Sequence, residues 1–154
     1  MGKIKALVVD DSKIMRSAVK RALDQLMLAE FEYVEAMDGE DALEKFKSEG
    51  DVEIMFVDWN MPNMTGVELS MEVRKMGDTE HIPIIMVTAE KSMGKVDKAL
   101  NEGGANEYIT KPFTADKMAQ TIGKYIDENG RMATVSEDRD EDDNEKGFFK
   151  SILK

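Results

Sequence analysis

Residues 54–64, with the sequence IMFVDWNMPNM, leave few folds open to this chain. The first four are apolar without a break, which is typical of a strand that is buried on both faces in a parallel sheet. The apolar run stops at Asp58. In open α/β sheets the ligand crevice lies at the carboxyl ends of the strands, so Asp58 is predicted to stand at the functional edge.

Short apolar runs alternate with helical patterns along the rest of the chain. The predicted strands span residues 5–9, 33–36, 54–57, 82–87 and 107–110. The predicted helices span residues 12–27, 40–47, 65–76, 92–101 and 114–129, because apolar residues recur there at helical spacing between capping residues. Five strands alternating with five helices predict an α/β fold, a doubly wound five-stranded parallel sheet with helices on both faces, over residues 1–129.

Composition excludes several classes of function. The chain carries 32 acidic and 21 basic residues, which argues against nucleic acid as a partner because that binding depends on Lys and Arg. There is no cysteine for a disulfide or thiolate site, and the single His81 is interpreted as a loop residue. No apolar run reaches the length of a membrane span and no signal peptide is recognised, so we expect a cytoplasmic protein that does not bind membranes.

The composition changes at Gly130. Residues 137–145 hold seven acids and no apolar side chain, so residues 130–146 are predicted to form an acidic, disordered linker. Residues 147–154 become apolar again, and their large apolar side chains recur at helical spacing: Phe148, Phe149, Ile152 and Leu153. Two interpretations of this short amphipathic tail stay open, a disordered terminus and a peptide that docks on a partner protein.

Polar side chains of complementary type follow four of the predicted strands. Asp10 and Asp11 follow the first strand, Asp58 the third, Thr88 the fourth and Lys111 the fifth. The carboxyl ends of parallel strands lie side by side, so these side chains are predicted to share one crevice.

The residue types in this crevice indicate phosphoryl chemistry. Three crowded carboxylates repel one another, and Mg²⁺ relieves this because it prefers oxygen ligands. Mg²⁺ and Lys111 would neutralise charge on a transferring phosphoryl group while Asp58 attacks phosphorus. The hydroxyl of Thr88 would hold one phosphoryl oxygen.

With these motifs the sequence resembles the CheY-like receiver domains of bacterial two-component response regulators, over residues 3–129. The motifs that carry the resemblance are VVDDS at 8–12, DWNMPNM at 58–64, MVTAE at 86–90 and KPF at 111–113. The resemblance implies the flavodoxin-like strand order 2-1-3-4-5 and a cis bond between Lys111 and Pro112.

The resemblance also implies a role for each site residue. Asp58 is the expected phosphoacceptor, and Thr88 and Lys111 are expected to contact the phosphoryl group. The implied Mg²⁺ ligands are Asp10, Asp11, Asp58 and the backbone carbonyl of Asn60. Thr88 and Tyr108 are the implied switch residues, and Asn60 and Glu90 occupy the positions that tune water access.

The implied partner is a sensor histidine kinase that donates a phosphoryl group from phosphohistidine. The protein would catalyse its own aspartyl phosphorylation and hydrolyse the product slowly, without acting as an enzyme on other substrates. A monomer that signals by protein binding in chemotaxis is expected. The target stays open: a flagellar motor switch protein, a phosphatase or another protein.

Three other functions compete with this interpretation. A flavodoxin-like electron carrier needs a phosphate-binding loop of small and hydroxyl residues, whereas here that loop begins with Asp10 and Asp11. A phosphatase with an aspartyl nucleophile needs a nearby general acid, and Asn60 supplies an amide there. A transcription factor is disfavoured because no helix-turn-helix pattern follows residue 129.

Overall fold

The structure is a computed structural model that describes residues 3–133 of the 154-residue chain. The sheet consists of β1 (Ile4–Val9), β2 (Phe31–Ala36), β3 (Ile54–Val57), β4 (Ile84–Thr88) and β5 (Glu107–Thr110). The helices are α1 (Lys13–Leu26), α2 (Gly39–Glu49), α3 (Gly66–Lys75), α4 (Met93–Asp97) and α5 (Ala115–Ile122). Two short turns, η1 (Lys98–Glu102) and η2 (Gly123–Tyr125), follow α4 and α5. The tail of residues 147–154, with Phe148, Phe149, Ile152 and Leu153, lies outside the described residues.

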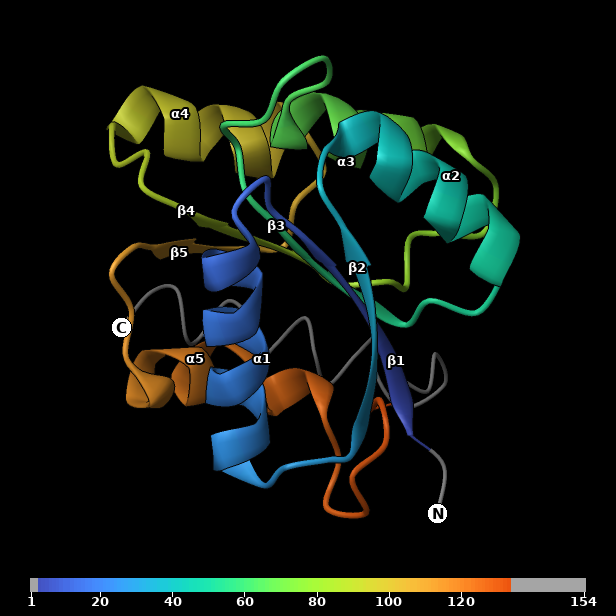
Figure 1. The fold of residues 1–154 in the computed structure, drawn as a ribbon, viewed down its shortest axis with the longest axis vertical. Coiled ribbons are helices and arrows are strands. Elements are labelled where there is room, and N and C mark those ends of the chain that lie inside the picture. Colours follow the sequence, from blue (N-terminus) through green and yellow to red (C-terminus); the bar gives the residue numbers. More distant parts are fainter. Residues whose placement is uncertain (1–2, 134–154) are drawn as a thin grey trace, which may run out of the picture.

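The five strands form one sheet in the order β2-β1-β3-β4-β5, and every neighbouring pair is parallel. This confirms the predicted fold class and the strand order that the resemblance implied. The crossover helices lie on both faces of the sheet (Figure 1). The carboxyl ends of β1, β3, β4 and β5 therefore meet at one edge, as the sequence predicted.

Side chains that alternate along the strands feed two core clusters. Leu7, Val9, Met55 and Val57 belong to the cluster that includes residues of α2 and α3. The side chains that point to the other face of the sheet, such as those of Ala6, Val8 and Phe56, belong to the cluster that includes residues of α1 and α5. Burial on both faces explains why the central strand reads as an unbroken apolar run.

The final helix is shorter than the sequence predicted. We expected a helix through residue 129, but α5 ends at Ile122 and a single 3₁₀ turn follows. The Asp127 carboxylate then accepts hydrogen bonds from the backbone N–H groups of Asn129 and Arg131, at 2.8 and 3.0 Å. Such side-chain turns compete with helix, and this one returns the chain so that Met132 packs against the core.

The fourth helix also departs from a regular pattern. The predicted helix over residues 92–101 is a five-residue α-helix, α4, continued by the π-helical turn η1. Ser92 caps α4 by accepting a hydrogen bond from the backbone N–H of Lys95. None of the helices described between residues 3 and 133 is long and apolar enough to cross a membrane.

Candidate functional site

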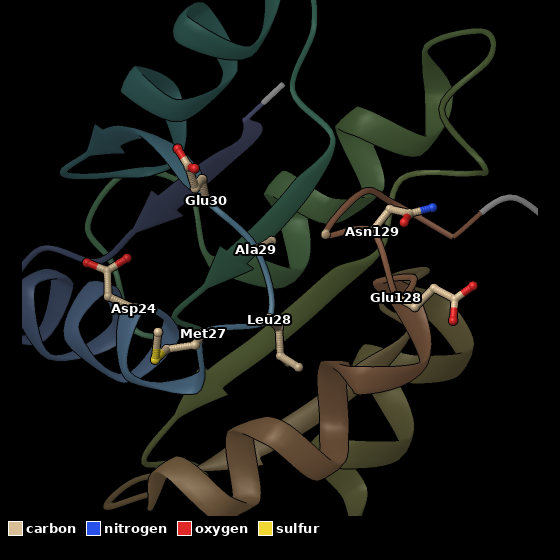
Figure 2. A pocket seen from close by; sticks show the side chains of 8 residues that line it. Asp24, Met27, Leu28, Ala29, Glu30, Glu128 and Asn129 are labelled. Atoms are coloured by element: carbon tan, nitrogen blue, oxygen red, sulfur yellow. The ribbon is translucent and has the colours of Figure 1, made fainter. Parts of the chain in front are cut away.

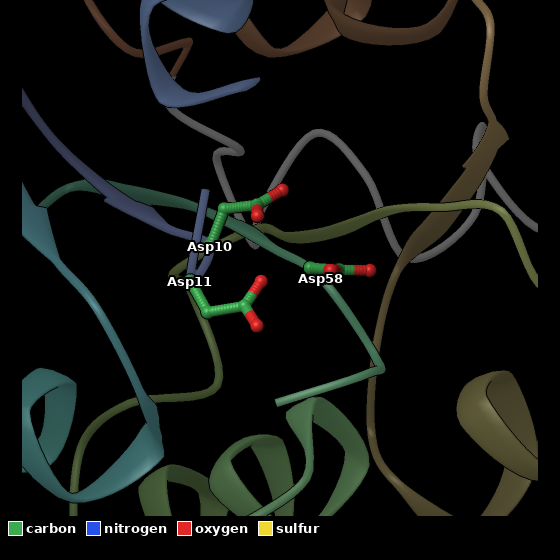
Figure 3. Close-up of side chains that lie close together, drawn as sticks. All are labelled: Asp10, Asp11 and Asp58. Atoms are coloured by element: carbon green, nitrogen blue, oxygen red, sulfur yellow. The ribbon is translucent and has the colours of Figure 1, made fainter. Parts of the chain in front are cut away.

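The acidic cluster is positioned by the pairing of β1 with β3. Val9 lies opposite Val57, and the backbone N–H of Asp58 donates to the carbonyl oxygen of Val9 at 3.0 Å. The sheet therefore places Asp10 and Asp11 beside Asp58, with their carboxylates gathered at one edge (Figure 3). One oxygen from each carboxylate lies within 4.8 Å of the others. Asp10 and Asp58 are only 4% and 6% exposed, whereas Asp11 faces solvent.

Lys111 supplies the positive charge of the site. Its Nζ lies 2.8 Å from Oδ2 of Asp10 and 3.6 Å from Oδ2 of Asp58. The backbone N–H of Lys111 donates to the carbonyl oxygen of Thr88 at 2.9 Å, so the ends of β4 and β5 are held together. The bond from Lys111 to Pro112 is cis, as the resemblance implied.

The contacts of Asp58 do not fully compensate for the burial of its carboxyl group. Burial raises the pKa of its carboxyl group, and the Asp10 charge adds to this, while the Thr88 hydroxyl and the Lys111 ammonium act in the opposite direction. Its Oδ1 atom is buried and, among the described residues, has no hydrogen-bond partner. Buried polar atoms are normally satisfied, so this oxygen indicates a place where a ligand atom belongs.

The loop after β1 holds Asp10 from two sides. The backbone N–H of Ser12 donates to Oδ1 of Asp10 at 2.9 Å, and Nη1 of Arg16 donates to the Asp10 carbonyl oxygen at 2.6 Å. Arg16 also donates to the Glu35 carboxylate at 2.9 Å. Arg16 was not predicted from the sequence, because an arginine in the first turns of a helix carries no signal that it reaches a strand end.

Gly66 brings the start of α3 against the end of β3. A Cβ at this position would lie 2.1 Å from the carbonyl oxygen of Asp58, a distance that real contacts do not show. The backbone N–H of Gly66 donates to the carbonyl oxygen of Trp59 at 3.0 Å, and Thr65 and Glu68 form a capping box. The loop from Asp58 to α3 is therefore fixed by backbone contact that only glycine permits.

Glu90 connects the predicted tuning and switch residues. Its carboxylate accepts a hydrogen bond from the Asn60 amide at 2.9 Å, and its backbone carbonyl accepts one from the Tyr108 hydroxyl at 2.8 Å. Its backbone N–H lies 3.4 Å from the hydroxyl oxygen of Thr88. All the predicted site residues within the described chain thus gather at the carboxyl edge, with Asn60 and Tyr108 at its rim.

A pocket of about 400 Å³ lies at the opposite edge of the sheet, between the turn after α1 and the turn near Gly130 (Figure 2). Its acidic side chains are Asp24, Glu30 and Glu128. The Asp24 carboxylate already accepts a hydrogen bond from the Tyr33 hydroxyl at 2.7 Å. Among the described residues, the carboxylate cluster that could hold a metal ion lies at the edge that carries Asp58.

Comparison with known proteins decides the family. Residues 6–123 match the family described as the response regulator receiver domain. The chain belongs to this family. The chemotaxis protein CheY1 of Helicobacter pylori is 38% identical over 126 residues, which cover 82% of this chain and 99% of that protein.

Solved structures of receiver domains share the fold. The chemotaxis protein CheY4 of Vibrio cholerae is 32% identical with a TM-score of 0.68, over 77% of this chain and 95% of that one. A chain from the CheX–CheY–BeF3–Mg complex of Borrelia burgdorferi is 26% identical with a TM-score of 0.67, over 76% of this chain and 84% of that one. This receiver domain is thus similar to response regulators of the chemotaxis type.

Proposed function

We propose that this receiver domain is a chemotaxis response regulator that is activated by phosphorylation of Asp58 and signals by binding other proteins. The observation that carries the proposal is the buried Asp58 carboxylate, with one unpartnered oxygen, between two further carboxylates and the Lys111 ammonium. A nucleophile, a cation and a set of metal ligands are the parts that phosphoryl transfer to aspartate requires.

The residues present fit a divalent cation. Asp10, Asp11 and Asp58 offer three carboxylate oxygens in one cluster, and the orphaned Oδ1 of Asp58 lacks a protein partner within the described chain. Together with the backbone carbonyl of Asn60, these carboxylates would hold Mg²⁺. Such an ion, when bound, neutralises negative charge on the phosphoryl oxygens.

In the proposed transfer, a carboxylate oxygen of Asp58 attacks the phosphorus atom of a phosphohistidine on a sensor kinase. The phosphorus–nitrogen bond breaks, its electron pair returns to the imidazole ring, and an aspartyl phosphate forms. Lys111 stands 3.6 Å from Asp58 and balances part of the arriving charge. Thr88, fully buried at the end of β4, offers a hydroxyl to one phosphoryl oxygen.

The proposed signal passes from Thr88 to the surface through Glu90 and Tyr108. A phosphoryl group adds roughly 1.5 to 2 negative charges and draws the Thr88 hydroxyl toward it. The Thr88 hydroxyl also faces the backbone N–H of Glu90, whose carbonyl oxygen holds the Tyr108 hydroxyl. Movement of Thr88 therefore changes the hydrogen bond between Glu90 and Tyr108. Tyr108 is a half-buried side chain on β5 that a partner protein can contact.

Labelling tests the phosphoacceptor. The protein should take up phosphoryl groups from a phosphorylated histidine kinase or from acetyl phosphate in Mg²⁺, and EDTA should prevent the uptake. Asp58→Asn should abolish labelling, whereas Asp78→Asn, at an exposed position, should label normally. Full labelling of Asp58→Asn would overturn the assignment.

A second experiment tests the output. The full chain, treated with beryllofluoride as a mimic of the aspartyl phosphate, should capture a target protein more strongly than the untreated chain. A flagellar motor switch protein and a phosphatase are the proposed targets. The protein is proposed to bind them as a monomer in the cytoplasm. Equal capture with and without beryllofluoride would contradict phosphorylation-dependent binding.

A further inference from the structure

Lys95, in the short helix α4, reaches back over the rim of the phosphorylation site. Its Nζ lies 2.9 Å from Oε1 of Glu90 and 5.3 Å from the centroid of the Trp59 ring. Trp59 follows Asp58 directly in the chain and is only 8% exposed. One ammonium group therefore contacts both a tuning residue and the neighbour of the phosphoacceptor.

The Glu90 carboxylate has two partners. Oε2 accepts a hydrogen bond from Asn60 and Oε1 pairs with Lys95, so the carboxylate spans the gap between the loop after β3 and α4. Both contacts favour the ionised form, and they hold the pKa of Glu90 below its usual value, with the Asn60 contact first. Without Lys95, only Asn60 would hold this side chain across the gap.

We propose that Lys95 is a positioning residue for hydrolysis of the aspartyl phosphate, holding Glu90 against Asn60 across the entrance to Asp58. The proposal rests on the proposed function. Asn60 lies two residues after Asp58, and Glu90 two residues after Thr88. Asn60 is exposed and Glu90 partly exposed, whereas Asp58 is buried, so the hydrogen-bonded pair lies on the solvent side of the phosphoacceptor. A firmly held pair would limit the access of water to the aspartyl phosphate.

The contact of Lys95 with Trp59 also restricts the position of the ammonium group that pairs with Glu90. A lysine ammonium within about 6 Å of an indole centroid is attracted by the ring, and the indole here is buried. The lysine stem is otherwise flexible, so the ring restricts where the ammonium can stand when it meets Glu90. Trp59 also provides a spectroscopic signal for the same contact, because it is the chain's only tryptophan.

The size of the effect follows from the exposure of the pair. The side chains of Lys95 and Glu90 are 44% and 28% exposed, which places their ion pair among those of modest strength. Replacement by methionine removes the charge and keeps most of the stem. We expect Lys95→Met to accelerate dephosphorylation two- to fivefold.

The test compares four full-length proteins: wild type, Lys95→Met, Lys95→Arg and Lys91→Met. Lys91 is the matched control, an exposed lysine in the loop just before α4. After labelling from acetyl phosphate in Mg²⁺, the donor is removed and the loss of phosphoryl groups is timed. Lys95→Met should lose them two- to fivefold faster and shift the Trp59 emission, whereas the arginine variant and the control should resemble wild type.

A double-variant cycle separates positioning through Glu90 from a general loosening of α4. In a Glu90→Gln background, Lys95→Met should change the dephosphorylation rate little, because its ionic partner is already gone. An equal acceleration in both backgrounds, or an unchanged or slower rate in Lys95→Met alone, would overturn the proposal. If no protein labels at all, the proposed function itself fails, an outcome distinct from normal labelling with an unaltered rate.

Discussion

Replacing Asp58 by asparagine should stabilise the metal-free protein, although it removes the proposed phosphoacceptor. The carboxylate is buried, one oxygen has no partner among the described residues, and burial is the largest cause of its raised pKa. A carboxyl group whose pKa is raised on folding opposes the folded state once it ionises. At neutral pH the ionised Asp58 therefore lowers the free energy of unfolding. A neutral side chain of the same shape should restore part of this loss.

The magnitude follows from the contacts of Asp58. With an effective dielectric constant of about 20, repulsion from Asp10 within 4.8 Å costs at least about 3.5 kcal/mol. Attraction to Lys111 at 3.6 Å returns about 4.6 kcal/mol, and the exposed Asp11 adds about 1 kcal/mol of screened repulsion. The charges nearly cancel, which leaves the unsatisfied buried oxygen at about 1–3 kcal/mol. Because the asparagine amide is also polar, we expect a gain of about 1–2 kcal/mol.

The assay is urea unfolding at pH 7, followed by circular dichroism in EDTA and again in Mg²⁺. Asp58→Asn should be more stable than wild type in EDTA, and Asp78→Asn should match wild type. In Mg²⁺ the wild type should gain stability by mass action, while Asp58→Asn, which has lost a ligand, should gain less. Equal or lower stability of Asp58→Asn in EDTA would refute the reasoning from burial.

Three further predictions concern other parts of the chain. Glu35 is paired with Lys20 and Arg16, and its pKa is lowered from 4.5. In acid-unfolding curves, the stability that the wild type has over Glu35→Gln should therefore be complete above pH 4.5 and disappear as the pH falls through the lowered pKa. Arg74 donates to the carbonyl oxygens of Gly104, Thr79 and Ile82, so Arg74→Met should lower the free energy of unfolding in urea by about 3 kcal/mol, whereas Arg21→Met, at an exposed position, should not. Truncation after Asn144 should leave labelling of Asp58 intact but weaken capture of the partner in a pull-down, and equal capture would show that residues 147–154 are not a docking peptide.

The core of the site was predictable because it depends on strand ends. Asp10, Asp58 and Thr88 each follow a short apolar run, and a parallel sheet brings such positions together whatever the details of packing. The end of α5 was not predictable from periodicity, because the apolar spacing continues past Ile122 while the Asp127 side chain forms a competing turn. Local hydrogen bonding thus decided an element boundary that the apolar pattern left undetermined.

The contacts of Arg16 and Lys95 escaped prediction for a different reason. Both are long cations on helices, where a sequence pattern indicates only a solvated face. Their partners depend on where the helix lies over the sheet, and on turns such as the one that Ser92 caps at the start of α4. The proposed site residues are therefore encoded locally, whereas the residues that position them become visible only with the packing.

The charge balance of the site connects its stability to its proposed chemistry. Three carboxylates face one ammonium, so the crevice keeps two uncompensated negative charges before any phosphoryl group arrives. A phosphoryl group brings roughly 1.5 to 2 more, and Lys111, already paired with Asp10, cannot balance both. Transfer to Asp58 should therefore depend on a divalent cation, which is why EDTA should prevent labelling. The unpartnered Oδ1 of Asp58, which makes the metal-free fold costly, is thus also an oxygen that such a cation could bind.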